Sequence, residues 1–257
     1  MQVTGVTGAA LVLPGALGFA PALRNSPVTS RRLVLDAPTT GFEDTGTWTT
    51  HDAEVALLEQ IAADPDANTM TLTVVGLTAQ ERPLHQVVFG LGATQNGTPK
   101  TMPTTMVLGS QHGNEPAGRD ASLKLIRDLA YADLEDPSNA DLKRLLQEQT
   151  IVVVPSANPD GREAGSRANS RGFDINRDHL RLETEEARTF ADVILEWAPF
   201  MALDLHEYGP SAPVAYDDDL LYLWSRNLNV DEAVRTMAEE YCVQYIKKDG
   251  EAAGYTA

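Results

Sequence analysis

Apolar residues recur along the chain with two different periods, and these periods predict its secondary structure. Apolar positions three or four residues apart predict helices over 51–62, 116–130, 141–149, 184–197 and 230–241. Short runs rich in β-branched residues predict strands over 71–75, 84–89, 105–108, 151–154 and 200–205. Because strands alternate with helices, the pattern predicts an α/β fold in which a mixed, mostly parallel sheet is flanked by helices.

The predicted strand at 151–154 consists only of β-branched residues, which is typical of a strand buried on both faces of a sheet. In open α/β sheets, ligands bind beyond the carboxyl ends of the strands. Functional residues are therefore expected in the three segments that follow Leu108, Val154 and Leu205.

Composition narrows the possible chemistry. The chain has 257 residues, which fits one large domain, and its 37 acidic and 20 basic residues give a formal net charge of -17. Such a negative surface repels phosphate backbones, so we expect no nucleic-acid partner. Cys242 is the single cysteine, so any metal site must use His, Asp and Glu. The five histidines are His51, His85, His112, His179 and His206.

The N-terminal part differs from the rest of the chain. Residues 1–22 contain an uncharged apolar stretch that is too short and too interrupted by Gly and Pro to span a membrane. It resembles the apolar region of a secretory signal, which predicts export; the alternative is an apolar arm packed on the domain. Residues 23–50 are predicted to be irregular, and residues 51–257 to form the catalytic domain.

Two candidate metal ligands follow the strand at 105–108. His112 and Glu115 are three residues apart in a turn that contains Gly113, so their side chains can point to one place. Two histidines and one glutamate form a known catalytic zinc set. The pair alone also occurs in ordinary surface turns, so a third ligand is needed to support the interpretation.

His206 is the candidate third ligand, because apolar residues lead directly to it at the end of the strand at 200–205. Asp204 lies two residues earlier on the same side of the strand and is a candidate acceptor for the outer nitrogen of His206. Taken alone, His206 is better explained as a partly buried, hydrogen-bonded histidine.

A polar stretch follows the buried strand at 151–154 and brings four arginines into an otherwise acidic chain. Arginine presents a planar fork that suits carboxylates and developing oxyanions. Ion pairs with the acidic surface are the alternative explanation for these charges. The arginines are Arg162, Arg167, Arg171 and Arg177.

The order of these motifs resembles the zinc carboxypeptidase (funnelin) family of metallopeptidases. The resemblance rests on His112-x-x-Glu115, Asn158-Pro-Asp-Gly161, Asn176-Arg177 and the strand-end His206, and it covers residues 105–209. It implies one Zn²⁺ per chain and a sheet of about eight strands between helices. It also implies hydrolysis of C-terminal peptide bonds through a zinc-activated water.

The resemblance also implies a role for each matching residue. His112, Glu115 and His206 match the zinc ligands, and Arg167 matches the catalytic arginine that polarises the scissile carbonyl and stabilises its oxyanion. Asn176 and Arg177 match the pair that binds the terminal carboxylate of the substrate.

One expected residue is missing from the pattern. The family's general-base glutamate lies on a strand after the last ligand, whereas no acidic residue after His206 ends an apolar, strand-like run. We therefore expect a fragment that lacks the C-terminal part, binds zinc and hydrolyses peptides very slowly or not at all. The alternatives are a zinc-dependent deacylase of N-acyl amino acids and a non-catalytic relative that binds carboxylates.

Overall fold

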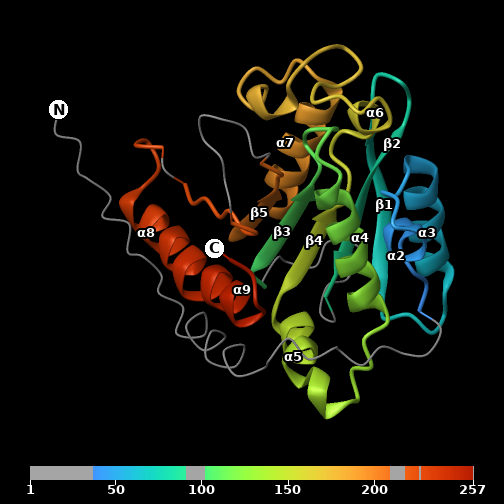
Figure 1. Ribbon diagram of the computed structural model, residues 1–257, viewed down its shortest axis with the longest axis vertical. Helices are drawn as coiled ribbons and strands as arrows, with labels where there is room; N and C mark the ends of the chain where they lie inside the picture. Colours follow the sequence, from blue (N-terminus) through green and yellow to red (C-terminus); the bar gives the residue numbers. More distant parts are fainter. Residues whose placement is uncertain (1–36, 91–101, 209–217, 226, 257) are drawn as a thin grey trace, which may run out of the picture. The chain divides into compact units, whose positions relative to one another are not determined.

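The computed structural model describes residues 37–90, 102–208, 218–225 and 227–256 (Figure 1). These residues fall into two compact units, one ending at Glu207 and the other beginning at Tyr208. The predicted domain at 51–257 therefore extends over both units. The sheet and the candidate ligands all belong to the first unit.

The first unit is built on a five-stranded mixed sheet with the order β1-β2-β4-β3-β5. Each of the five predicted strands is present. β1 pairs with β2 and β2 with β4 in antiparallel fashion, whereas β3 pairs with β4 and with β5 in parallel. The sheet is mixed as predicted, and half of these pairings are parallel. The strands are β1 (Met70–Leu77), β2 (Pro83–Phe89), β3 (Thr104–Gly109), β4 (Thr150–Val154) and β5 (Met201–Leu205).

The long helices of the first unit begin within one residue of their predicted starts. Thr50 caps α3 by accepting a hydrogen bond from the Ala53 amide, and Thr184 caps α7 in the same way. Pro116 is the N-cap residue of α4 and not its first residue, which moves the predicted start by one position. The helices are α3 (His51–Ala63), α4 (Ala117–Ala130), α5 (Ala140–Glu148) and α7 (Glu185–Trp197).

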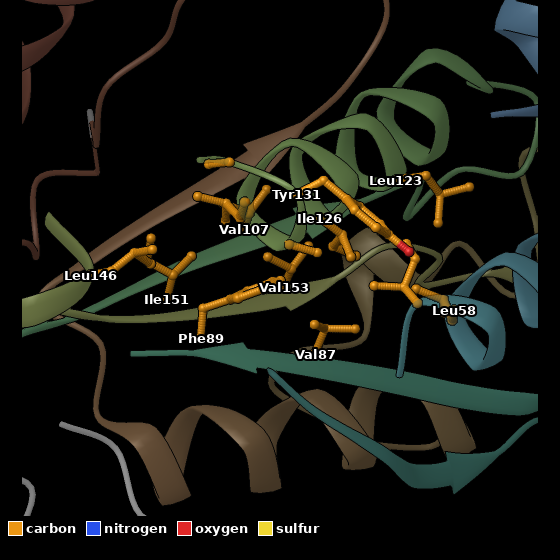
Figure 2. Packing of buried hydrophobic residues seen from close by; sticks show 14 of the residues in the cluster. Leu58, Val87, Phe89, Val107, Leu123, Ile126, Tyr131, Leu146, Ile151 and Val153 are labelled. Atoms are coloured by element: carbon orange, nitrogen blue, oxygen red, sulfur yellow. The ribbon is translucent and has the colours of Figure 1, made fainter. Parts of the chain in front are cut away.

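Apolar side chains fill both sides of the sheet. On one face, Val87 and Val153 pack with Leu58 of α3 and Ile126 of α4, as Figure 2 shows. On the other face, alternate strand residues such as Val152 pack against α7. All five residues of β4 are buried, which confirms that this strand lies in the interior of the sheet. Packing on both faces thus holds the parallel strands β3, β4 and β5 in place, and their carboxyl ends lie at the same end of the sheet.

Two segments that were predicted to be irregular contain short helices. The stretch at 156–178 includes α6 (Pro159–Glu163) and the 3₁₀ turn η3 (Ile175–Arg177). Asn158 caps α6 and Asp174 caps η3 with their side-chain oxygens, so the polar residues that suggested a loop stabilise these turns. The described part of 23–50 contains the single-turn helix α2 (Gly41–Thr45), and the 3₁₀ turn η2 (Pro137–Asn139) precedes α5.

In the second unit, helix α8 (Glu232–Tyr241) agrees with the helix predicted at 230–241. The helical path continues as a π-helix, η4 (Cys242–Lys247), and as α9 (Lys248–Ala252), where no final helix was predicted. Cys242 is buried and carries no disulfide. Within the described ranges, no helix is long and apolar enough to cross a membrane.

Some predictions concern residues that the structure does not describe. The signal remnant at 1–22 is one of them, so export stays a prediction. The others are the turn predicted from Asn96-Gly97 and the suggestion that Ser211, Pro213 and Tyr216 border the site.

Candidate metal centre

Three side chains from two segments meet at the carboxyl ends of β3 and β5. The Nδ1 atom of His112 lies 2.9 Å from Oε1 of Glu115, and the Nδ1 atom of His206 lies 2.8 Å from Oε2 of Glu115. The two Nδ1 atoms are 3.1 Å apart. One ligand atom from each of the three residues lies within 4.8 Å of the others. The ligand set predicted from the sequence is therefore brought together.

The turn after β3 is held by a buried serine. Ser110 has a φ of 52° and is fully buried. Its hydroxyl donates to the carbonyl of Glu115 and accepts from the amide of Arg119, so it closes the turn that carries both ligands. Gly113 is required for a different reason, because a Cβ at this position would lie 2.0 Å from the backbone carbon of Gly161. The ligand turn therefore packs backbone to backbone against the start of α6.

The outer nitrogen of His112 is bound by Asp174. Nε2 of His112 lies 3.2 Å from Oδ1 of Asp174, and Oδ2 of Asp174 accepts a hydrogen bond of 2.9 Å from Nε of Arg167. Partial burial opposes ionisation of Asp174, but Arg167 and His112 together hold the pKa of this carboxyl below its usual value. Asp174 is thus a carboxylate that connects a ligand histidine to the predicted catalytic arginine.

The outer nitrogen of His206 lies 2.9 Å from Oδ2 of Asp204. This hydrogen bond raises the pKa of His206, although burial of the ring acts in the opposite direction. The Nδ2 atom of Asn176 is 3.1 Å from the same nitrogen. When Nδ1 of His206 binds a metal, Nε2 carries the proton and donates to Asp204, so the amide of Asn176 cannot also donate there. Its NH₂ group is then available to another acceptor.

The donor set fits a zinc ion. It consists of two imidazole nitrogens and one carboxylate, and His112 and Glu115 are buried. Both Nδ1 atoms face Glu115, while both Nε2 atoms face a carboxylate. With a metal bound at the two Nδ1 atoms, each Nε2 would carry the proton and donate it to Asp174 or Asp204.

The three predicted substrate-side residues lie at different distances from the ligands. Nη1 of Arg167 is 3.5 Å from Oε1 of Glu115, and the side chain is about half exposed. Asn176 contacts His206, as described above. Arg177 is exposed and donates through Nη1 to the carbonyl of Asn176. Arg167 and Asn176 thus contact ligand residues, whereas Arg177 contacts the backbone of Asn176. The roles of all three residues stay predictions.

Comparison with known proteins identifies the family. The family model described as zinc carboxypeptidase matches residues 55–254. The chain belongs to the zinc carboxypeptidase family. A probable carboxypeptidase 2 of the fungus Trichophyton verrucosum is 36% identical over 152 residues, which are 57% of this chain and 28% of that protein. Carboxypeptidase E of Caenorhabditis elegans is 31% identical over 126 residues, 44% of this chain and 26% of that protein.

Solved structures share the fold. Bovine thrombin-activatable fibrinolysis inhibitor, solved in complex with tick carboxypeptidase inhibitor, has a TM-score of 0.56 at 15% identity and covers 80% of this chain and 74% of that chain. Carboxypeptidase A from Helicoverpa armigera has a TM-score of 0.52 at 22% identity and covers 76% and 51%. The chain spans 28% of the length of the first fungal relative.

Not all motif residues of this member of the family lie at the metal centre. Asp160 is buried and accepts hydrogen bonds from Thr78, Arg82 and Ser170, so it joins the β1–β2 turn to the loop after α6. Arg171 pairs with Glu185 at 2.9 Å, as the ion-pair explanation predicts. These residues stabilise the loop. Arg162 donates to the carbonyl of Gly113 in the ligand turn, whereas Arg167 lies beside the ligand carboxylate of Glu115.

Sequence reasoning assigned no role to several residues around the metal centre. Asp174 is one, and its position two residues before Asn176 gave no indication of a contact with His112. Gln111 and His179 also belong to the surrounding hydrogen bonds. Glu207 directly follows the ligand His206, and its carboxylate accepts a hydrogen bond of 2.5 Å from the Ala117 amide.

Proposed function

We propose that this chain carries the zinc-binding and carboxylate-binding residues of a metallocarboxypeptidase, which removes C-terminal residues from peptides. The observation that supports this proposal most is the meeting of His112, Glu115 and His206 around one point, with the guanidinium of Arg167 3.5 Å from Glu115. Membership of the zinc carboxypeptidase family supports it independently.

Each residue has a distinct part in the proposed mechanism. When bound, zinc supplies Lewis-acid polarisation of a carbonyl and makes a water molecule more acidic. Asp174 orients Arg167, whose guanidinium stabilises the negative charge that develops on the carbonyl oxygen. Asn176 and Arg177 donate to the terminal carboxylate and so place the last peptide bond beside the ligands.

Proton transfer needs a further group. The described carboxylates near the ligands are already engaged, since Asp174 binds Arg167, Asp204 binds His206 and Glu207 binds the Ala117 amide. We therefore propose that this chain binds zinc and a C-terminal carboxylate but turns peptides over very slowly or not at all. Fast release of a C-terminal residue by this chain would contradict that part of the proposal.

Binding of matched peptides tests the function without requiring turnover. A peptide with a free C-terminal carboxylate should bind the zinc-loaded chain more tightly than the same peptide with a terminal amide. Arg177→Gln should remove this preference, because the guanidinium that recognises the carboxylate is lost. Equal binding of both peptides would contradict the proposed carboxylate recognition.

The same assay addresses the two alternatives. An N-acyl amino acid that is deacylated while the peptide is neither bound nor cleaved would indicate the deacylase, which the comparisons do not favour. Peptide binding that persists after zinc is removed would indicate a non-catalytic carboxylate-binding relative.

A further inference from the structure

A buried glutamine lies directly behind the metal centre. Gln111 is 2% exposed, and its Nε2 atom donates a hydrogen bond of 2.6 Å to Oδ2 of Asp204. Its Oε1 atom lies 2.9 Å from Nε2 of His179. The amide is therefore held at both ends, between a carboxylate that accepts and a ring nitrogen that donates.

These contacts fix the orientation of three side chains in turn. The carboxylate of Asp204 accepts only, so Gln111 must present its NH₂ group there and its carbonyl oxygen to His179. His179 then carries its proton on Nε2. Asp204 in turn accepts from Nε2 of His206, which directs the free lone pair of Nδ1 towards Glu115.

Asp204 needs the hydrogen bond from Gln111 because its carboxylate is exposed. Its side chain is 40% exposed, whereas the side chain of His206 is 14% exposed. An exposed carboxylate with a single contact can rotate away from the imidazole, and a buried donor of fixed orientation opposes that rotation. The ligand histidine that is remotest in sequence from the other two therefore depends on a residue adjacent to His112.

We propose that Gln111 is a positioning residue for the metal centre, that it acts on His206 through Asp204, and that His179 fixes the Gln111 amide from the outside. This inference rests on the proposed zinc site. It adds that zinc affinity depends on the hydrogen bonds that join His179, Gln111 and Asp204, none of which is a metal ligand. The substitution of an outer partner of this kind typically weakens metal binding by about 10- to 100-fold.

The test is the zinc dissociation constant, measured by competition with a chromogenic chelator. Gln111→Met keeps the length of the side chain but removes both hydrogen bonds, and we expect zinc binding to weaken about tenfold, at the lower end of that range. Asp204→Ala should weaken it at least as much. The double variant should be no weaker than Asp204→Ala, because Gln111 acts only through Asp204. His179→Ala should cause a smaller loss that disappears in the Gln111→Met background.

A matched substitution elsewhere separates positioning from general destabilisation. Gln86 on β2 is also buried and accepts a hydrogen bond from Trp197, so Gln86→Met removes a comparable glutamine away from the ligands. It should leave zinc affinity unchanged. The absorption spectrum of the Co²⁺-loaded protein gives a second readout, and it should change in Gln111→Met but not in Gln86→Met.

The outcomes distinguish this inference from the proposed function. No zinc binding by the folded wild type overturns the proposed function and this inference with it. If the wild type binds zinc and Gln111→Met binds it with unchanged affinity, the inference alone is overturned. The inference is also overturned if Gln111→Met weakens zinc binding as much in the Asp204→Ala background as it does in the wild type. If circular dichroism shows that Gln111→Met does not fold, Gln111→Glu replaces it. That variant keeps the side-chain size, loses the donor to Asp204, and should bind zinc at least tenfold more weakly.

Discussion

The Oε2 atom of Glu115 lies 2.8 Å from the Nδ1 atom of His206, although the two residues are 91 positions apart in the chain. Parallel pairing of β3 with β5 explains this contact, because Gly109 and Leu205 are paired at the ends of these strands. Residues that follow the two strands therefore enter the same space. The register of β3 and β5 thus places the ligands together. Substitutions that shift the segments after these strands should therefore change the affinity for the metal.

Asp174 should be necessary for a tightly held zinc ion. Asp174→Asn weakens the acceptor for His112 and removes the charge that pairs with Arg167. We expect zinc to bind about 10- to 100-fold more weakly, as for other outer-ligand partners. Chelator competition measures this. Asp128→Asn, which alters an arginine-paired carboxylate on α4, is the control and should bind zinc as the wild type does.

Gly113→Ala should disrupt the metal centre by steric conflict. The new methyl group would lie 2.0 Å from the Gly161 carbon and 2.2 Å from the Arg162 nitrogen, so the ligand turn must move away from α6. Zinc binding should be lost, and the midpoint of thermal unfolding should fall. Gly46→Ala is the control for zinc affinity, because it adds backbone strain at a φ of 67° but no steric contact; it should lower the unfolding midpoint and leave zinc binding unchanged. Retention of full zinc affinity in Gly113→Ala would show that the turn is not tightly packed.

The positions of the ligands could be predicted from the sequence because they depend on strand ends. The β-branched run at 151–154 predicted a buried strand, and apolar residues before His206 predicted another. Both strands are present; the segment after β5 supplies the ligand His206, and the segment after β4 supplies Asp174, which contacts the ligand His112. The pattern of apolar residues therefore predicted the strands, and the rule that ligands bind at the carboxyl ends of strands predicted where the site lies.

The contacts around the ligands could not be predicted in the same way. They depend on the path of residues 156–178, which is set by side-chain caps at Asn158 and Asp174 and not by any apolar period. Asn158 also donates to the carbonyls of Gln111 and Arg167 across the loop. Such long-range hydrogen bonds leave no pattern in a single sequence. The extension of α8 into η4 and α9 was missed for a different reason, because it contains Gly250, and glycine is a residue that often ends a helix.

Asp160 should contribute stability that depends on pH. Burial opposes its ionisation, but hydrogen bonds from Ser170, Arg82 and Thr78 lower its pKa. A carboxyl group whose pKa is lowered in the folded state stabilises the fold above its unfolded pKa of about 3.9, and this stabilisation is lost as the pH falls through the folded pKa. Asp160→Asn should cost about 2–3 kcal/mol at pH 7. Urea unfolding at pH 7 and pH 3 measures this, and an equal difference between wild type and variant at both pH values would contradict it.

Glu186 should show the opposite dependence. It is fully buried on α7, and desolvation raises its pKa although Asn169 donates to it. A carboxyl group whose pKa is raised on folding destabilises the fold when ionised, so its contribution improves as the pH falls from neutral towards its unfolded pKa of about 4.3. Glu186→Gln should therefore raise the urea midpoint at pH 7 and have less effect at pH 5. A lower midpoint for the variant at pH 7 would contradict this assignment.

We propose that the segments after β3 and β5 together form one zinc site. The most direct test is the zinc content per chain after extensive dialysis, measured for the wild type and for His206→Ala by an elemental method. We expect about one zinc per wild-type chain, from a single set of three ligands, and a clear loss in the variant. A folded wild type without zinc, or a His206→Ala variant that retains it fully, would contradict the account.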